Sequence, residues 1–165
     1  MAGGFLLGLL GLSAGCATGR IVDGVYRDSG NGYQVHLPPV PWVQAPLDGS
    51  VLAFKAAPLG AAMAMDVKCT QPEEGELLWV ANHLFFGLQD KRIQEQQAVR
   101  IQDAEGVRSR LVATLDGRPV EVEGVTARRG ECLYDFMFVA PPSEFARGRP
   151  DFAFFVNSWT PLPER

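Results

Sequence analysis

The sequence contains few of the residues from which catalytic and metal sites are built. Among its 165 residues are three cysteines and two histidines, and neither Cys69 nor Cys132 has a neighbouring Cys or His at zinc-site spacing. No serine occupies the turn of a nucleophile elbow, and no glycine-rich phosphate-binding loop is present. We therefore expect no enzymatic activity, no metal and no cofactor.

A strong charge of one sign is also missing. The formal net charge is −4, and Lys and Arg are scattered, with only the short pairs Lys91-Arg92 and Arg128-Arg129. A nucleic-acid-binding domain usually carries a basic patch or stripe. The composition thus argues against nucleic acid as a partner.

No apolar run in the sequence is long enough to span a membrane, because a membrane-spanning helix needs about 20 apolar residues. The apolar run of residues 5–12 is shorter and is followed by the small residues Ser13, Ala14 and Gly15. A short apolar core before small residues is typical of a secretory signal. The pattern predicts a signal peptide over residues 1–15 and a lipid attachment point at Cys16. The alternative is an apolar N-terminal tail or strand with a chance cysteine.

The segment Leu12-Ser13-Ala14-Gly15-Cys16 resembles the lipobox of bacterial lipoproteins. In that family the cysteine thiol receives a diacylglyceryl group, the signal is cut before the cysteine, and the new amine is usually acylated. The resemblance implies a membrane partner, bound through a lipid anchor at Cys16. Ala17 stands where an aspartate often retains such proteins in the inner membrane, which favours the outer membrane, facing the periplasm. Residues 1–4 lack the family's Lys or Arg, which indicates an upstream start or a weak signal.

Cys69 and Cys132 are the two cysteines left once Cys16 carries lipid. Exported proteins occupy compartments where disulfides persist, so we predict that these two are bonded. The enclosed loop would add roughly 4 kcal/mol of stability in the chain-entropy model. The alternative is a pair of buried free thiols, which behave as small hydrophobic side chains.

Alternation of apolar and polar residues predicts most of the secondary structure as strands. Residues 16–31 are expected to form a tether and a first turn, and residues 32–160 a single domain. Asp116-Gly117 is a strong hairpin signal. The predicted strands cover residues 33–37, 51–57, 61–69, 93–99, 107–115, 119–127 and 132–139.

Two helices are predicted. The first runs from about residue 72 to residue 88, with a buried stripe of helical spacing that Leu78, Trp79 and Phe86 would widen. The second begins near Ser143, and Pro150 is expected to split it. The order of elements predicts an α+β fold, a curled antiparallel sheet with helices packed on its faces.

This order resembles the PsbP-like fold, and specifically uncharacterised bacterial lipoproteins, over about residues 24–159. The similarity includes Gly32-Tyr33-Gln34-Val35, Leu115-Asp116-Gly117-Arg118 and Val139-Ala140-Pro141-Pro142. PsbP-like domains are generally non-enzymatic extrinsic subunits or binding modules at a membrane surface. The resemblance implies such a role here, although no functional residue of the family can be carried over.

Three side chains are the remaining candidates for chemistry. His36 is expected at the surface and His83 packed beside the first helix's apolar stripe, and a pairing with Asp66 or Asp135 would be needed for a catalytic dyad. Asp135 lies within an apolar strand, where a carboxylate is costly unless paired. Arg128 or Arg147 could pair with it, or it could face solvent. The alternative is a ligand-binding or catalytic acid.

The sequence therefore predicts a lipid-anchored, non-catalytic protein of the cell envelope. It would act as a binding or accessory module for a membrane protein complex. The alternative hypothesis is a carrier of a small apolar ligand or lipid, held in a cleft between the sheet and the C-terminal helix.

Overall fold

The computed structural model describes residues 19–69 and 75–163. Cys16 and the predicted signal peptide lie outside these residues. The described part is an α+β fold with two helices and two antiparallel sheets. The predicted fold class is confirmed.

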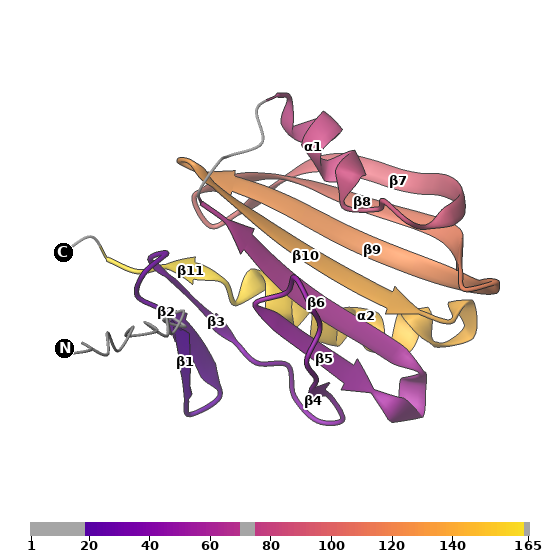
Figure 1. Ribbon diagram of the computed structural model, residues 1–165, viewed down its shortest axis with the longest axis horizontal. Coiled ribbons are helices and arrows are strands. Elements are labelled where there is room, and N and C mark those ends of the chain that lie inside the picture. Colours follow the sequence, from indigo (N-terminus) through magenta and orange to yellow (C-terminus); the bar gives the residue numbers. More distant parts are fainter. Residues whose placement is uncertain (1–18, 70–74, 164–165) are drawn as a thin grey trace, which may run out of the picture.

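The larger sheet has seven strands in the order β4-β5-β6-β10-β9-β8-β7, all paired antiparallel (Figure 1). Asp116 and Gly117 both have positive φ, as a two-residue hairpin turn between β8 and β9 requires. A short 3₁₀ helix, Ala57–Leu59, joins β5 to β6. The strands are β4 (Val43–Gln44), β5 (Leu52–Ala56), β6 (Ala61–Lys68), β7 (Gln89–Ile101), β8 (Ala104–Leu115), β9 (Arg118–Arg129) and β10 (Cys132–Ala140).

The smaller sheet corrects one prediction. Residues 19–31, predicted as part of a tether, contain β1 (Gly19–Val22) and β2 (Val25–Asp28). They pair with β3 (Tyr33–His36) and β11 (Thr160–Pro161) in the order β1-β2-β3-β11. These strands have too few residues for an alternation to stand out in the sequence, and only the Asp23-Gly24 turn marks the first hairpin.

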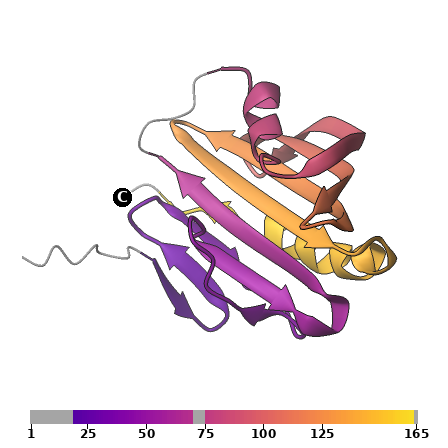
Figure 2. The same cartoon turned by 45° about the vertical axis from the view of Figure 1, so that its right-hand side comes forward.

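The two helices cover opposite faces of the large sheet (Figure 1, Figure 2). Alternate residues of the central strand β10 point to opposite sides. Phe136 and Phe138 lie in the main core with α2 (Pro142–Asn157), whereas Met137 and Val139 pack beside the smaller cluster under α1 (Leu77–His83). The face that carries α2 also carries the small sheet, through the buried residues Tyr33 and Val35.

Both helices differ from the sequence prediction. Described helix α1 ends at His83, and Leu78, Trp79 and Phe86 are exposed rather than buried. Helix α2 continues through Pro150. Proline removes the hydrogen bond to the carbonyl of Ala146, but Ala146 is exposed, so water can satisfy that carbonyl. Pro141, rather than Ser143, is the residue at its N-cap.

Candidate functional site

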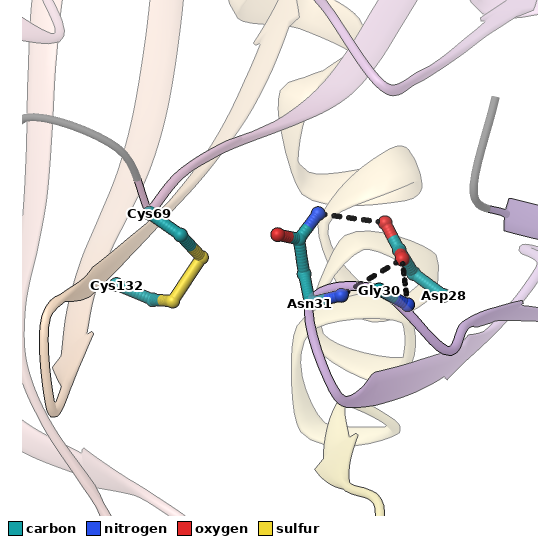
Figure 3. Close-up of a disulfide and its surroundings, with 5 residues drawn as sticks. All are labelled: Asp28, Gly30, Asn31, Cys69 and Cys132. Atoms are coloured by element: carbon teal, nitrogen blue, oxygen red, sulfur yellow. Dashed lines mark hydrogen bonds between the residues drawn. A yellow bond between two sulfur atoms is a disulfide. The ribbon is translucent and has the colours of Figure 1, made fainter. Parts of the chain in front are cut away.

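The predicted disulfide is present. Cys69 and Cys132 are bonded, 63 residues apart in sequence, and link the end of β6 to the start of β10 (Figure 3). The same view shows Asp28 accepting hydrogen bonds from the backbone N–H groups of Gly30 and Asn31, at 2.9 and 3.0 Å. The disulfide and this turn each fix a connection of the fold.

The two histidines lie apart from any catalytic partner in the described part of the chain. The ring of exposed His36 lies 6.2 Å from the ring of Phe154. His83, which was expected to be packed, is exposed, and its ring contacts the Trp79 ring edge-on, with 3.9 Å between centroids. In residues 19–69 and 75–163, neither imidazole bonds to a carboxylate.

Asp135 accepts a hydrogen bond of 2.6 Å from the hydroxyl of Thr126 on the neighbouring strand β9. Arg147, one of its predicted partners, instead pairs with Glu144 on its own helix. Across the other side of β10, Asp135 is directly opposite Asp66. Burial raises the pKa of Asp66, partly offset by the Val67 N–H and by Lys68. Two carboxylates therefore share one face of the sheet.

The cleft predicted between the sheet and the C-terminal helix is filled by side chains. Phe138 of β10 stacks against Phe145 and Phe152 of α2, with ring centroids 5.1 and 5.6 Å apart. Phe155 and Val156 are fully buried in the same interface. The aromatic residues thus form core here, and the predicted location of an apolar cleft is wrong.

An apolar groove lies instead on the opposite face of the sheet, the face of α1. Its floor is formed by Ala62, Ala64, Met137 and Val139 of β6 and β10, and residues 45–47 form one wall. No helix among the described residues covers these positions, because α1 packs over β8 and β9. The alanines of β5 and β6 have short side chains that do not fill the space above the sheet, and the groove lies in that space.

The volume of the groove limits what it can hold. It measures about 150 Å³, whereas pockets for small molecules and cofactors usually measure about 300–1,000 Å³. An apolar side chain of a partner protein fits this space, and a whole lipid does not.

Exposed apolar residues lie on the same side of the sheet as the groove. Phe86, Trp79 and Leu78 are 89, 56 and 46% exposed at α1 and the turn after it. Leu47 at the wall of the groove is 54% exposed. These side chains add exposed apolar surface to the face of the sheet that carries the groove.

A buried ion pair on the α2 face escaped the sequence analysis. Glu123 of β9 is 1% exposed, and Arg149 of α2 donates a hydrogen bond of 2.6 Å to its carboxylate. Arg108 of β8 lies 3.4 Å away on the other side. The Glu123 carboxylate raises the pKa of Arg149. The three residues are far apart in sequence, and only the alternation of β9, which places Glu123 among buried residues, hints at the pair.

The described residues contain neither a cluster of metal-binding side chains nor a membrane-spanning helix. In residues 19–69 and 75–163, no group of three or more His, Cys, Asp or Glu could hold a metal ion. No helix in the same ranges is long and apolar enough to cross a membrane.

Comparison with solved structures defines the class of fold. The chain superimposes on cyanobacterial PsbP (CyanoP) from Synechocystis with a TM-score of 0.63 and 12% sequence identity, over 94% of this chain and 99% of that one. The protein therefore has a PsbP-like fold.

Two other solved structures are similar. LpqN of Mycobacterium tuberculosis, described as involved in cell envelope biogenesis, has a TM-score of 0.59 and 10% identity, over 81% of this chain and 86% of LpqN. PA94 of Pseudomonas aeruginosa, a putative regulator of unknown function, has a TM-score of 0.55 and 13% identity, over 77% of this chain and 85% of PA94. The sequence matches no protein-family model and no curated protein. At these identities the likeness concerns the fold alone.

Proposed function

We propose that this protein is a lipid-anchored, non-catalytic accessory module of the cell envelope, which binds a partner protein through the groove over β6 and β10. The observation that carries the proposal is the uncovered apolar floor formed by Ala64, Met137 and Val139. Its small volume favours an apolar side chain of a protein over a carried lipid.

The anchor supports the envelope location. The lipobox-like segment ends at Cys16, three residues before the first described strand. The disulfide suits an exported protein, because such bonds persist outside the cytoplasm. LpqN, whose fold is similar, is described as involved in cell envelope biogenesis, and we propose an envelope setting for this chain.

The groove can be tested by capture of partners from detergent-solubilised envelope. Leu47→Asp places a charge at the groove wall, where the side chain is exposed, so the fold should persist. Leu115→Asp is the matched control, because Leu115 is also exposed but lies at the β8–β9 hairpin. We expect the wild type and the control to capture the same protein, and Leu47→Asp to lose it. Equal capture by both variants would overturn the groove as the binding site.

The anchor is tested separately by labelling with radioactive palmitate. We expect label in the wild type and none in Cys16→Ser. Equal labelling of the two proteins would remove the lipid anchor from the proposal.

A further inference from the structure

The outer face of the small sheet carries two arginines directly opposite each other. Arg20 of β1 pairs in register with Arg27 of β2, and Arg27 with Gln34 of β3. These side chains point away from the core, because the alternate residues Tyr33 and Val35 are fully buried. The row of polar residues therefore faces outward.

Opposed like charges destabilise a pair of strands unless an anion lies between them. Among the described residues, no carboxylate forms an ion pair with Arg20 or Arg27, whereas Arg147 and Arg149 have carboxylate partners. The two arginines line a depression of about 330 Å³ together with Val22, Asp23, Val25 and Gln34, and Asp23 is the one carboxylate among its described lining residues. The depression combines guanidinium groups with the exposed side chain of Val22 and the half-buried side chain of Val25.

The position of this face along the chain indicates its partner. Gly19, the first residue of β1, is three residues after Cys16. Three extended residues reach about 10 Å at most, close to the Debye length of about 8 Å at physiological ionic strength. A lipid on Cys16 would thus hold β1 within electrostatic range of the bilayer surface.

We propose that the outer face of β1 and β2 docks on anionic phospholipid headgroups, with Arg20 and Arg27 against their phosphates and Val22 at the interface. This geometry builds on the proposed lipid attachment at Cys16. Arginine suits the role because its planar guanidinium forms paired hydrogen bonds with phosphate oxygens. The groove over β6 and β10 lies on another sheet and stays free for a protein partner.

The test uses the native lipidated protein in vesicles of phosphatidylcholine, with or without phosphatidylglycerol. Phenylglyoxal modifies accessible guanidinium groups, and peptide mass spectrometry reports each arginine. We expect modification of Arg20 and Arg27 to slow about five-fold each in the anionic vesicles, the effect of one arginine near an anionic surface. The exposed residues Arg92 and Arg118 are internal controls and should react equally in both vesicles.

A pair of variants supplies a second readout. In anionic vesicles the backbone amides of β1 and β2 should exchange hydrogen more slowly than in neutral vesicles, for the wild type and for R92Q/R118Q. R20Q/R27Q, which changes the net charge by the same amount, should lose this difference.

The possible failures are distinct. Equal modification of Arg20 and Arg27 in both kinds of vesicle, with the protein still anchored, would overturn the docking face and leave the anchor intact. Equal protection by inorganic phosphate in neutral vesicles would assign the site to free phosphate rather than to a bilayer. If the protein associated with neither kind of vesicle, both the lipid anchor and the docking geometry would be overturned.

Discussion

At the scale of single residues, the burial of Glu123 gives the two arginines that pair with it a larger role in stability than arginines paired at the surface. Arg149 supplies the short hydrogen bond, and Arg108 remains at 3.4 Å if Arg149 is removed. An uncompensated buried charge is costly, and breaking a buried pair costs about 3–5 kcal/mol. The pair thus constrains how α2 sits on β9.

Arg149→Ala should therefore lower the free energy of unfolding by about 3 kcal/mol, near the lower limit because Arg108 still compensates part of the charge. Arg147→Ala is the control on the same helix. Arg147 pairs with Glu144 at the surface, so its loss should cost about 0.5 kcal/mol or less. Urea unfolding of both variants measures the difference, and equal midpoints would show that Glu123 does not depend on Arg149.

A second prediction concerns Asp66 and the dependence of stability on pH. Burial raises its pKa above the ordinary value of 3.8, so the folded protein holds more protons than the unfolded chain between these two pKa values. Stability then falls as the pH rises through that window. Asp66→Asn should raise the melting temperature at neutral pH, and the gain should vanish well below pH 3.8. The asparagine oxygen can still accept the bond from the Val67 N–H.

Asp103 is the matched control of opposite sign. The hydrogen bond from Arg129 holds the pKa of exposed Asp103 below its usual range. Its contribution is present above the ordinary pKa and is lost as the pH falls through the folded-state value. Asp103→Asn should therefore slightly lower the melting temperature at neutral pH. A shift in the same direction for both variants would contradict the assignment of Asp66.

At the scale of elements, a glycine decides how closely α1 approaches the sheet. A Cβ added at Gly124 of β9 would lie 2.6 Å from the Phe85 ring and 2.8 Å from Leu84. Phe85 is 3% exposed and, with Leu111 and Val122, forms the small core under α1. The lack of a side chain at Gly124 thus allows the helix to dock.

Gly124→Ala should displace Phe85 and cost about 1–3 kcal/mol, as overpacking usually does. Hydrogen exchange should become faster in α1 but not in α2. Gly106→Ala, on the other face of the sheet, has its nearest contact at 3.2 Å and should leave exchange in α1 unchanged. Unaltered exchange of α1 in Gly124→Ala would show that the helix does not depend on this close approach.

Strands β6 and β9 could be predicted because their period of two is sustained over many residues, and β10 because nearly every one of its residues is apolar. The hairpin at Asp116-Gly117 was equally clear, since the turn demands positive φ at both positions. The short strands β1 and β2 could not be predicted this way. The apolar character of Phe86 predicts a buried side chain, but Phe86 is exposed. No pattern in the sequence distinguishes an exposed apolar residue from a buried one.

The candidate groove was beyond the reach of sequence reasoning for a different reason. Its floor needs Met137 beside Ala64, and its wall is the loop before β5. The register of β6 with β10 places Met137 directly opposite Ala64, more than 70 positions earlier in the chain. A pattern along one strand predicts which residues share a face, but it does not predict which strand lies next to it. The disulfide was predicted because only two cysteines remained to pair.

At the scale of the whole molecule, that disulfide closes the part of the chain that contains α1 and the strands β7, β8 and β9. Its loop spans 63 residues, for which the chain-entropy model gives about 4 kcal/mol. Much of this stabilisation comes from restricting the unfolded chain. The native sheet needs no rearrangement without it, since Leu133 and Lys68 already pair in register.

Replacing Cys69 and Cys132 together with serine should lower the free energy of unfolding by about 4 kcal/mol while the native fold persists in the absence of denaturant. Urea unfolding followed by circular dichroism measures the change, and reduction of the wild type should reproduce it. Cys16→Ser is the matched control, since Cys16 precedes the first described strand, and its midpoint should equal that of the wild type. If reduction left the wild-type midpoint unchanged, the pairing of β6 with β10 alone, and not the covalent link, would hold the two halves of the sheet together.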